Sequence, residues 1–286
     1  MARKFNIALS SRLSPFQKFY LLIIAGFILG PFIPLIIQSF AFRWAWPDLL
    51  PGTWWLEQRD RAMVPLAWDY VLSPYSRVWE ATVNPVLIGS IVTVICLAIC
   101  LPAARVLARE KFRGKSAFEF FLSLPLIVPE AAIGIALLMM FIRLGLAGSY
   151  VGIIIAHLIP TIPYMVRMLT AVYQGLGRDF EEQAMILGAS RWQVLRLVTL
   201  PMLLPGVVAG ALFTFLVSTN IFLLTFFLGQ GQIVTLPTLL FSKIAGGTLD
   251  ASAAGITLIV TLPGIILLII SERFIKEEAF GKGFGN

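Results

Sequence analysis

The chain has 286 residues, of which 58% are hydrophobic and 13% are charged, and its net charge is +7. A water-soluble domain of this length exposes much of its surface to water and cannot hide so many apolar side chains. The apolar runs are long and continuous, which favours helices over a membrane barrel, because a helix satisfies its own backbone hydrogen bonds in lipid. The composition therefore excludes a soluble domain and predicts an all-α integral membrane protein.

Six apolar runs follow one another along the chain: residues 19–40, 85–104, 120–142, 148–172, 205–228 and 251–270. Each has about 20 residues or more, enough to cross roughly 30 Å of hydrocarbon. We interpret the first run as a retained anchor and not a cleaved signal, because it is long and no small-residue cleavage site follows it. We therefore expect about six transmembrane helices.

Lysine and arginine predict the direction in which these helices cross the membrane. With the N-terminus inside, 16 of the 22 basic residues lie in inner segments and 6 in outer segments, which places both termini in the cytoplasm. The positive charge then reflects topology, and we expect no nucleic-acid partner. The chain divides into a cytoplasmic tail (1–18), a first helix with an outer segment (19–84), a core transmembrane domain (85–271) and a second cytoplasmic tail (272–286).

The outer segment, residues 41–84, holds six of the seven tryptophans. Tryptophan prefers the membrane–water interface, where one side of the ring is in an apolar environment and the other is wet. The segment is interpreted as a cap on the outer surface. A binding surface for an outside partner would explain the same residues, and interfacial anchoring is the favoured interpretation.

An inner segment, residues 174–201, is expected to carry the function. Asp179 and Glu182 fit a capping box at a helix start, and Ser190 with Gln193 fits a second one. Gly188 between them suits the left-handed end of the first helix, and Pro201 is expected to end the second. Apolar residues on both short helices need cover, either from the protein's own spans or from a partner protein.

This segment resembles the EAA loop of type I ABC importer permeases, whose pattern is E-A-A, three residues, G, nine residues, I, one residue, L-P. The matching positions are Glu182, Gln183, Ala184, Gly188, Val198, Leu200 and Pro201, with Gln183 in place of alanine and Val198 in place of isoleucine. The resemblance implies that the loop is a coupling helix that docks on an ATPase subunit. It further implies a dimer of ATPase subunits, a second permease chain that we expect to be related but distinct, a periplasmic solute-binding protein, and residence in the bacterial inner membrane with surrounding lipid.

The sequence predicts no enzyme activity and no cofactor for this chain, with ATP bound by the partner subunits. Gly114, Lys115 and Ser116 match only the end of a phosphate-binding loop, and Arg109 stands where its first glycine belongs. Cys96 and Cys100 are interpreted as packing residues and not as metal ligands, because too few other ligands accompany them. A stand-alone secondary transporter is the alternative function, although no internal repeat supports it.

Candidate residues for the solute pathway are the polar side chains within the apolar runs. They are Glu130 in the third run and Thr214, Ser218, Thr219 and Asn220 in the fifth. A buried charge in a membrane usually faces a cavity or a partner, whereas a carboxylate after Pro129 also suits a helix N-terminus. The hydroxyl groups could equally form hydrogen bonds between helices. Both interpretations stay open.

Within the importer class, the run VPEAAIGIALLMMF and the tryptophan-rich outer loop resemble the polyamine-type permeases. Those permeases often carry an acidic pair in the fifth span, where this chain has Ser218, Thr219 and Asn220. The missing acids disfavour a strongly cationic substrate. A small polar solute is expected, either polyamine-like or of the phosphonate, phosphorylated-solute, thiamine or ferric-iron classes.

Overall fold

The computed structural model describes residues 14–44, 47–61, 63, 65–247 and 250–281, and in residues 267–281 only the backbone. Residues 1–13 and 282–286 of the two predicted tails, and Trp46 of the outer segment, lie outside the described residues. The chain forms two compact units, Met1–Val71 with Leu249–Leu258, and Leu72–Thr248 with Ile259–Asn286. Each unit is described by itself.

The described part of the first unit contains an apolar helix and a small folded cap. Its elements are α1 (Pro15–Leu29), α2 (Phe32–Ser39), β1 (Ala41–Arg43), β2 (Thr53–Trp54), α3 (Trp55–Gln58), the 3-10 turn η1 (Arg59–Arg61) and α4 (Ala67–Val71). Ser14 and Gln17 form a capping box that starts α1, and α1 with α2 make one apolar stretch, Pro15–Ser39. β1 and β2 pair antiparallel. The predicted outer segment thus contains helical turns and a short hairpin.

Tryptophan side chains hold this cap together. Trp55 is buried and packs with Ala67 and Ala251, and the rings of Trp55 and Trp68 lie 6.2 and 6.0 Å from that of Phe40. Aromatic pairs at such distances add to the stabilisation from burial alone. Trp55 and Trp68 therefore have a structural role inside the cap.

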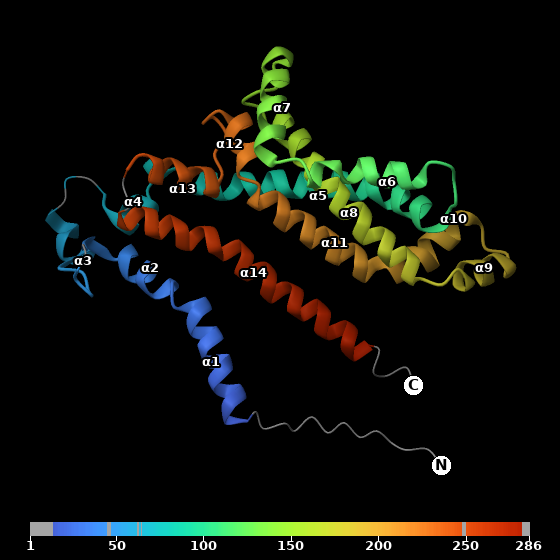
Figure 1. The fold of residues 1–286 in the computed structure, drawn as a ribbon, viewed down its shortest axis with the longest axis horizontal. Coiled ribbons are helices and arrows are strands. Elements are labelled where there is room, and N and C mark those ends of the chain that lie inside the picture. Colours follow the sequence, from blue (N-terminus) through green and yellow to red (C-terminus); the bar gives the residue numbers. More distant parts are fainter. Residues whose placement is uncertain (1–13, 45–46, 62, 64, 248–249, 282–286) are drawn as a thin grey trace. The chain divides into compact units, whose positions relative to one another are not determined.

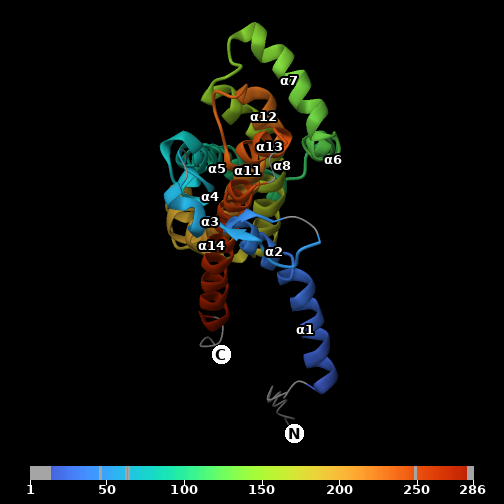
Figure 2. The same cartoon turned by 90° about the vertical axis from the view of Figure 1, so that its left-hand side faces the viewer.

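The second unit is a helical bundle that makes up most of the chain (Figures 1 and 2). Its elements are η2 (Pro74–Ser76), α5 (Val78–Arg109), α6 (Lys115–Ser123), η3 (Leu124–Leu126), α7 (Glu130–Leu144), α8 (Tyr150–Gly175), α9 (Asp179–Ile186), α10 (Arg191–Val194), the π-helical turn η4 (Leu195–Thr199), α11 (Leu200–Asn220), α12 (Leu223–Gly229) and α13 (Leu236–Ala245). The last helix, α14 (Ala251–Gly281), contributes to both units.

Helices α5, α8 and α11 pack side by side and form the core. Val92, Cys96 and Cys100 of α5 are fully buried there. Glycines of α11 let it approach α8 closely, because a Cβ atom on Gly206 would come within 2.4 Å of Val172. Small residues at a helix contact are the usual means of tight packing in membranes, where apolar side chains gain little by avoiding lipid.

Four described helices are long and apolar enough to cross a membrane, and the bent pair α6–α7 brings the number to five. The four are Pro15–Ser39, Val78–Arg109, Tyr150–Gly175 and Arg191–Asn220, and Ala251–Ile266 of α14 is a shorter apolar helix. The predicted class, an all-α membrane protein, is confirmed.

Two of the expected straight runs are broken. Residues 120–142 are interrupted between α6 and α7, which meet at 90°, because Pro125 and Pro129 lack the N–H groups that a continuous helix needs. Residues 205–228 are interrupted after Asn220, where Ile221 is extended and α12 starts as a separate helix. Apolar composition cannot reveal such bends, because a bent segment is as apolar as a straight one.

Candidate functional site

The predicted two-helix segment is present as a helical hairpin formed by α9 and α10, which we call the hairpin. Gly188 lies at its turn with φ +89°, in the left-handed region that glycine adopts without strain. Its N–H donates to the Met185 carbonyl at 3.0 Å, and that of Ala189 donates to Ala184 at 3.1 Å. These bonds satisfy carbonyls at the end of α9, as expected for a left-handed helix cap.

The second helix of the hairpin begins as predicted, and the first does not. Ser190 accepts from the Gln193 N–H, and the Gln193 side chain accepts from the Ser190 N–H, completing a capping box. The box predicted for Asp179 and Glu182 is wrong, because Arg178 is already in the helical conformation and no side chain caps α9. Asp179 instead lies inside the first turn, where an acidic residue complements the positive helix end.

Pro201 does not end the second helix, contrary to expectation. Arg191–Asn220 is one apolar helical stretch, and the π-helical turn Leu195–Thr199 precedes Pro201 within it. The Leu200 N–H donates to the carbonyl of Leu195. In an α-helix it would donate to the carbonyl one residue closer along the chain. We infer that this widened turn accommodates the proline, so that α10 leads directly into α11.

Glu181 is the residue of the hairpin that sequence reasoning missed. It is buried, its Oε1 accepts a 2.7 Å hydrogen bond from Thr199 Oγ1, and its Oε2 lies 3.7 Å from Arg105 Nη2. The carboxylate therefore joins α9 to the start of α11 and to α5. In the sequence, Glu181 stands beside two other acids, Asp179 and Glu182. Spacing alone does not show which of the three is buried.

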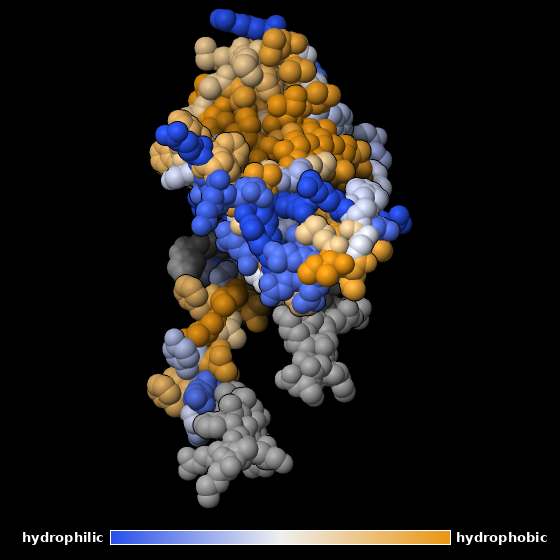
Figure 3. All heavy atoms as spheres, turned by 90° about the vertical axis from the view of Figure 1, so that its right-hand side faces the viewer, coloured by the Kyte–Doolittle hydropathy of each residue, from blue (hydrophilic) through white to orange (hydrophobic). Residues whose placement is uncertain are grey.

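Three large apolar side chains of the hairpin are largely exposed. Ile186, Leu187 and Trp192 are 83%, 88% and 66% exposed. Figure 3 looks onto this end of the bundle and shows apolar atoms beside a mainly hydrophilic surface. Of the positions predicted for ATPase coupling, Glu182, Gln183, Gly188 and Pro201 are exposed, and Ala184, Val198 and Leu200 are half-buried.

Three predicted pathway residues of α11 lie in different surroundings. Ser218 is buried, and its Oγ lies 3.0 Å from His157 Nδ1, whose Nε2 in turn lies 2.9 Å from Thr225 Oγ1. This chain of bonds links α8, α11 and α12. Thr214 is fully buried, and its hydroxyl has no hydrogen-bond partner among the described residues. Asn220 is exposed at the end of α11, with its amide bonded to the Leu216 carbonyl.

Glu130 and Thr219, the other two candidates, also bond to backbone groups. Glu130 starts α7, and its Oε1 accepts from the Leu224 N–H at 3.3 Å at the start of α12. Thr219 donates to the carbonyl of Leu216 on its own helix. Glu130 thus connects two short helices that lie beside each other, and it is only half-buried.

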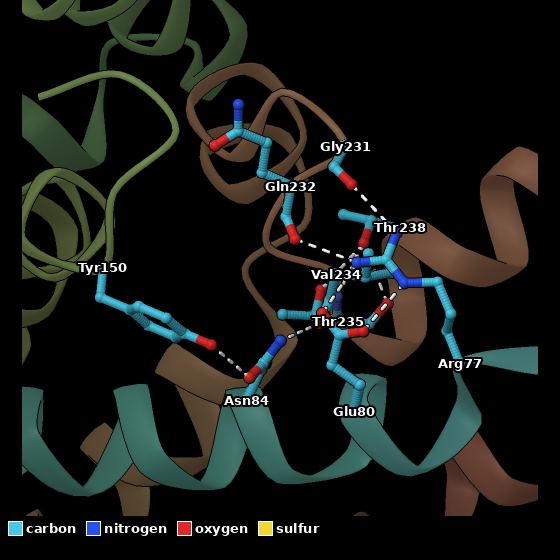
Figure 4. A network of polar contacts seen from close by, with 9 residues as sticks. All are labelled: Arg77, Glu80, Asn84, Tyr150, Gly231, Gln232, Val234, Thr235 and Thr238. Atoms are coloured by element: carbon cyan, nitrogen blue, oxygen red, sulfur yellow. Dashed lines mark hydrogen bonds and ion pairs between the residues drawn. The ribbon is translucent and has the colours of Figure 1, made fainter. Parts of the chain in front are cut away.

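At the opposite end of the bundle from the hairpin, a polar network holds the connection between α12 and α13 (Figure 4). Arg77 forms two 2.8 Å bonds with Glu80 and also donates to the carbonyls of Gly231 and Gln232 at 3.1 and 3.0 Å. The hydrogen bond with Glu80 raises the pKa of Arg77 above its ordinary value, so the guanidinium stays charged.

A second arm of this network centres on the buried side chain of Asn84. Asn84 donates to the Val234 carbonyl at 2.7 Å, and Tyr150 donates to Asn84 Oδ1 at 2.8 Å. Arg77 itself has φ +56°, an uncommon backbone conformation for a residue with a side chain. We call residues 229–235 with Arg77, Glu80, Asn84 and Tyr150 the outer clamp.

The described side chains contain no group of three or more His, Cys, Asp and Glu residues that would hold a metal ion. The bundle of apolar spans carries an exposed helical hairpin whose residues are spaced as in the EAA loop. The profile of the family described as "Binding-protein-dependent transport system inner membrane component" matches residues 100–277, and the chain belongs to this family.

Two curated relatives cover most of the chain. The molybdenum transport system permease protein ModB of Mycobacterium tuberculosis is 31% identical over 269 residues, 89% of this chain and 93% of the relative. The putrescine transport system permease protein PotI of Escherichia coli is 29% identical over 279 residues, 93% of this chain and 92% of the relative. The chain is thus a permease subunit of an ABC importer, and this family membership decides against a stand-alone secondary transporter.

A solved structure supports the same fold. A bacterial ABC transporter involved in the import of the acidic polysaccharide alginate matches with a TM-score of 0.66 and 19% identity, covering 91% of this chain and 98% of that one. The fold predicted from the sequence, that of a type I importer permease, is confirmed.

Proposed function

We propose that this chain forms one side of a solute pathway and that its hairpin receives the motion of a separate ATPase subunit. The observation that carries the proposal is the hairpin itself, which exposes Ile186, Leu187 and Trp192 at one end of the bundle. With the hairpin placed outside the lipid, exposed apolar groups of this kind mark a protein contact. Closure of two ATPase subunits would then pull on α9 and shift the bundle between inward and outward access.

The hairpin end faces the cytoplasm in this proposal, and the outer clamp faces the periplasm. Arg178, just before the hairpin, bonds to the Arg109 carbonyl at the end of α5, which brings the α5–α6 connection to the hairpin side. This side then carries Lys111 and Arg113 of the connection, Lys115 at the start of α6, and Arg178, Arg191 and Arg196, in accordance with the positive-inside rule. The outer clamp then meets a periplasmic solute-binding protein. A second permease chain, related but distinct, completes the pathway.

We choose the pathway residues among the polar side chains whose hydrogen-bonding groups are not all satisfied within their own helix. Asn220 is exposed at the end of α11, and Glu130 is half-buried beside α12. The orphan hydroxyl of Thr214 becomes available if α8 and α11 move apart, because an unpaired buried hydroxyl gains by finding a partner. Ser218 is engaged by His157, and we assign its main role to holding α8 and α11 together.

For the substrate, we propose a small oxyanion. Glu130, which accepts a hydrogen bond from the Leu224 N–H, is the one acid among the proposed pathway residues, and α11 carries no acid along its length, so α11 offers no charge partner to a cation. The molybdenum-transport relative agrees with this class. The phosphonate and phosphorylated-solute classes expected from the sequence are also oxyanions, whereas molybdate was not among the expected solutes. The putrescine-transport relative keeps a polyamine as the second candidate. Uptake of labelled molybdate with putrescine as competitor, and the reverse, distinguishes the two.

The ATPase contact is tested by co-purification of the tagged full chain from native membranes. Leu187→Asp places a charge on the exposed hairpin face and is expected to abolish recovery of the ATPase. Leu72→Asp is the matched control, since Leu72 is also a largely exposed leucine, at 77%, but lies outside the hairpin. Equal ATPase recovery with both variants, or transport by the chain alone, would overturn the proposal.

A further inference from the structure

A cavity of about 280 Å³ lies between α5, α6 and α8, outside the hairpin and the proposed pathway. Four of its lining residues are apolar, namely Leu107, Leu122, Val166 and Ala171. The other four are polar or charged, namely Glu119, Arg167, Thr170 and Gln174. A cavity lined by both kinds of residue suits an amphipathic ligand better than a water-soluble ion.

The two charged residues of this wall are opposite in sign and do not neutralise each other. Among the described side chains neither Arg167 nor Glu119 forms an ion pair, and Arg167 Nη2 donates only to Ser123 Oγ, at 2.7 Å. Ser123 Oγ in turn donates to the backbone carbonyl of Glu119. The guanidinium keeps further donors free, because it carries five N–H groups in all.

Thr170 adds an unused polar group to the same cavity. Its hydroxyl oxygen is buried and has no hydrogen-bond partner within the described part of the chain. A buried hydroxyl without a partner costs free energy that a ligand atom would recover. The wall therefore offers a cation, a hydroxyl and an amide for an anionic group, and a separate carboxylate for a cationic group.

The depth of the cavity corresponds to the headgroup level of the inner leaflet, in the orientation proposed above for the hairpin end. Leu107 lies two residues before the end of α5 at Arg109, and Glu119 lies four residues after the start of α6 at Lys115. At 1.5 Å per residue these positions are within about 6 Å of the helix ends. Arg167 lies further in, eight residues before the end of α8.

We propose that this cavity binds the headgroup of a zwitterionic aminophospholipid of the phosphatidylethanolamine type. Arg167 and the Thr170 hydroxyl hold the phosphate, the Glu119 carboxylate holds the primary ammonium, and the lipid backbone lies against Leu107 and Leu122. Arginine is the side chain suited to phosphate, and basic pockets on the cytoplasmic side of membrane proteins take lipid headgroups. The proposal rests on the orientation within the proposed function.

The opposite charges of Arg167 and Glu119 favour one kind of lipid headgroup over others. An anionic headgroup would bring its charge near Glu119 without compensation, because phosphatidylglycerol has no ammonium. A choline headgroup is zwitterionic but has no N–H to donate to the carboxylate, since its nitrogen is fully methylated. A primary amine on a phosphate diester satisfies both groups, and so we expect ethanolamine lipids to bind more tightly than the other two.

The test uses the complete importer, purified in detergent and examined by native mass spectrometry after mixing with phosphatidylethanolamine, phosphatidylcholine or phosphatidylglycerol. We expect wild type to retain ethanolamine lipid at least several-fold more than either other lipid. Arg167→Gln and Thr170→Val should each reduce that retention, and Glu119→Gln should remove the preference over phosphatidylglycerol. Arg143→Gln, at the exposed end of α7, is the matched control and should change nothing.

Two outcomes would overturn the lipid assignment. One is equal retention of the three lipids by wild type. The other is unchanged selectivity in Arg167→Gln, Glu119→Gln and Thr170→Val. Soluble phosphoethanolamine is added as a further arm, and its binding without lipid retention would assign the cavity to a soluble zwitterion and reject the lipid. ATPase recovery is measured in the same samples, so that failure of the lipid site and failure of the coupling proposal are told apart.

Discussion

Thr199 donates a 2.7 Å hydrogen bond to the buried carboxylate of Glu181, and this bond ties the first helix of the hairpin to the start of α11. Arg105 of α5 lies 3.7 Å from the other carboxylate oxygen. One acidic side chain therefore links three parts of the chain, α9, α5 and the start of α11, which must move together if the hairpin drives the bundle. The contact gives the hairpin a rigid connection to the spans, although its two helices have only eight and four residues.

Thr199→Val should loosen this connection. The substitution keeps the side-chain shape but removes a hydrogen bond to a charged group, which costs about 1.5–3 kcal/mol. We expect faster proteolytic cleavage at the hairpin turn and less solute-stimulated ATPase activity in the complete importer, at normal membrane insertion. Glu182→Gln is the control for cleavage, since Glu182 is exposed. Wild-type protection in Thr199→Val would show that the bond does not hold the hairpin.

Gly188→Val should uncouple transport without preventing insertion. Nothing lies within 4 Å of a Cβ placed on Gly188, so any effect comes from the backbone. Its φ of +89° would strain a β-branched residue at a cost of about 1–3 kcal/mol. Gly177→Val is the matched control, because Gly177 is equally open but has no positive φ. Solute uptake at equal expression should fall for Gly188→Val alone, and equal uptake would reject this role.

Glu130→Gln should separate the structural role of Glu130 from an electrostatic one. Glutamine keeps an oxygen that accepts from the Leu224 N–H, so α7 and α12 should stay joined while the charge is lost. An oxyanion should pass as well as before or better, whereas a cationic solute should pass more slowly, since charges are weakly screened away from bulk water. Molybdate and putrescine uptake are compared in one preparation. Impaired uptake of both would indicate a structural effect.

Asn220→Ala should slow uptake whatever the charge of the solute, because an exposed amide at the end of α11 is removed from the proposed pathway. ATPase recovery should not change, since Asn220 is at the far end of α11 from the hairpin. Thr82→Ala serves as a comparison, because Thr82 donates to the Val78 carbonyl of its own helix. If uptake is unaffected by Asn220→Ala, this end of α11 does not line the pathway.

Arg77→Lys should loosen the outer clamp although it keeps the charge. A lysine ammonium cannot reproduce the planar fork that serves Glu80 and two backbone carbonyls at once. We expect faster hydrogen–deuterium exchange in residues 229–235, and little change in the core of α8. Arg43→Lys is a control in the other unit. Unchanged exchange in residues 229–235 would show that Asn84 and Tyr150 suffice to hold the connection.

The sequence by itself determined the features that depend on neighbouring residues. Long apolar runs require helices in lipid, because backbone groups have no water to bond there. The turn at Gly188 and the capping box of Ser190 and Gln193 are likewise local, since each is settled within one or two helical turns. The spacing of the EAA-like pattern, from Glu182 to Pro201, then placed this hairpin directly before α11.

The tertiary structure decided the features that depend on which helix faces meet. Glu181 is buried and Glu182 is exposed because of where α5 and Thr199 lie, and no local pattern distinguishes the two acids. The same holds for His157, whose partners Ser218 and Thr225 are 61 and 68 residues away in sequence. Local preferences could not show that the helix continues through Pro201 or that the third run bends by 90°. In both places the positions of the surrounding helices determine how the backbone compensates for a proline.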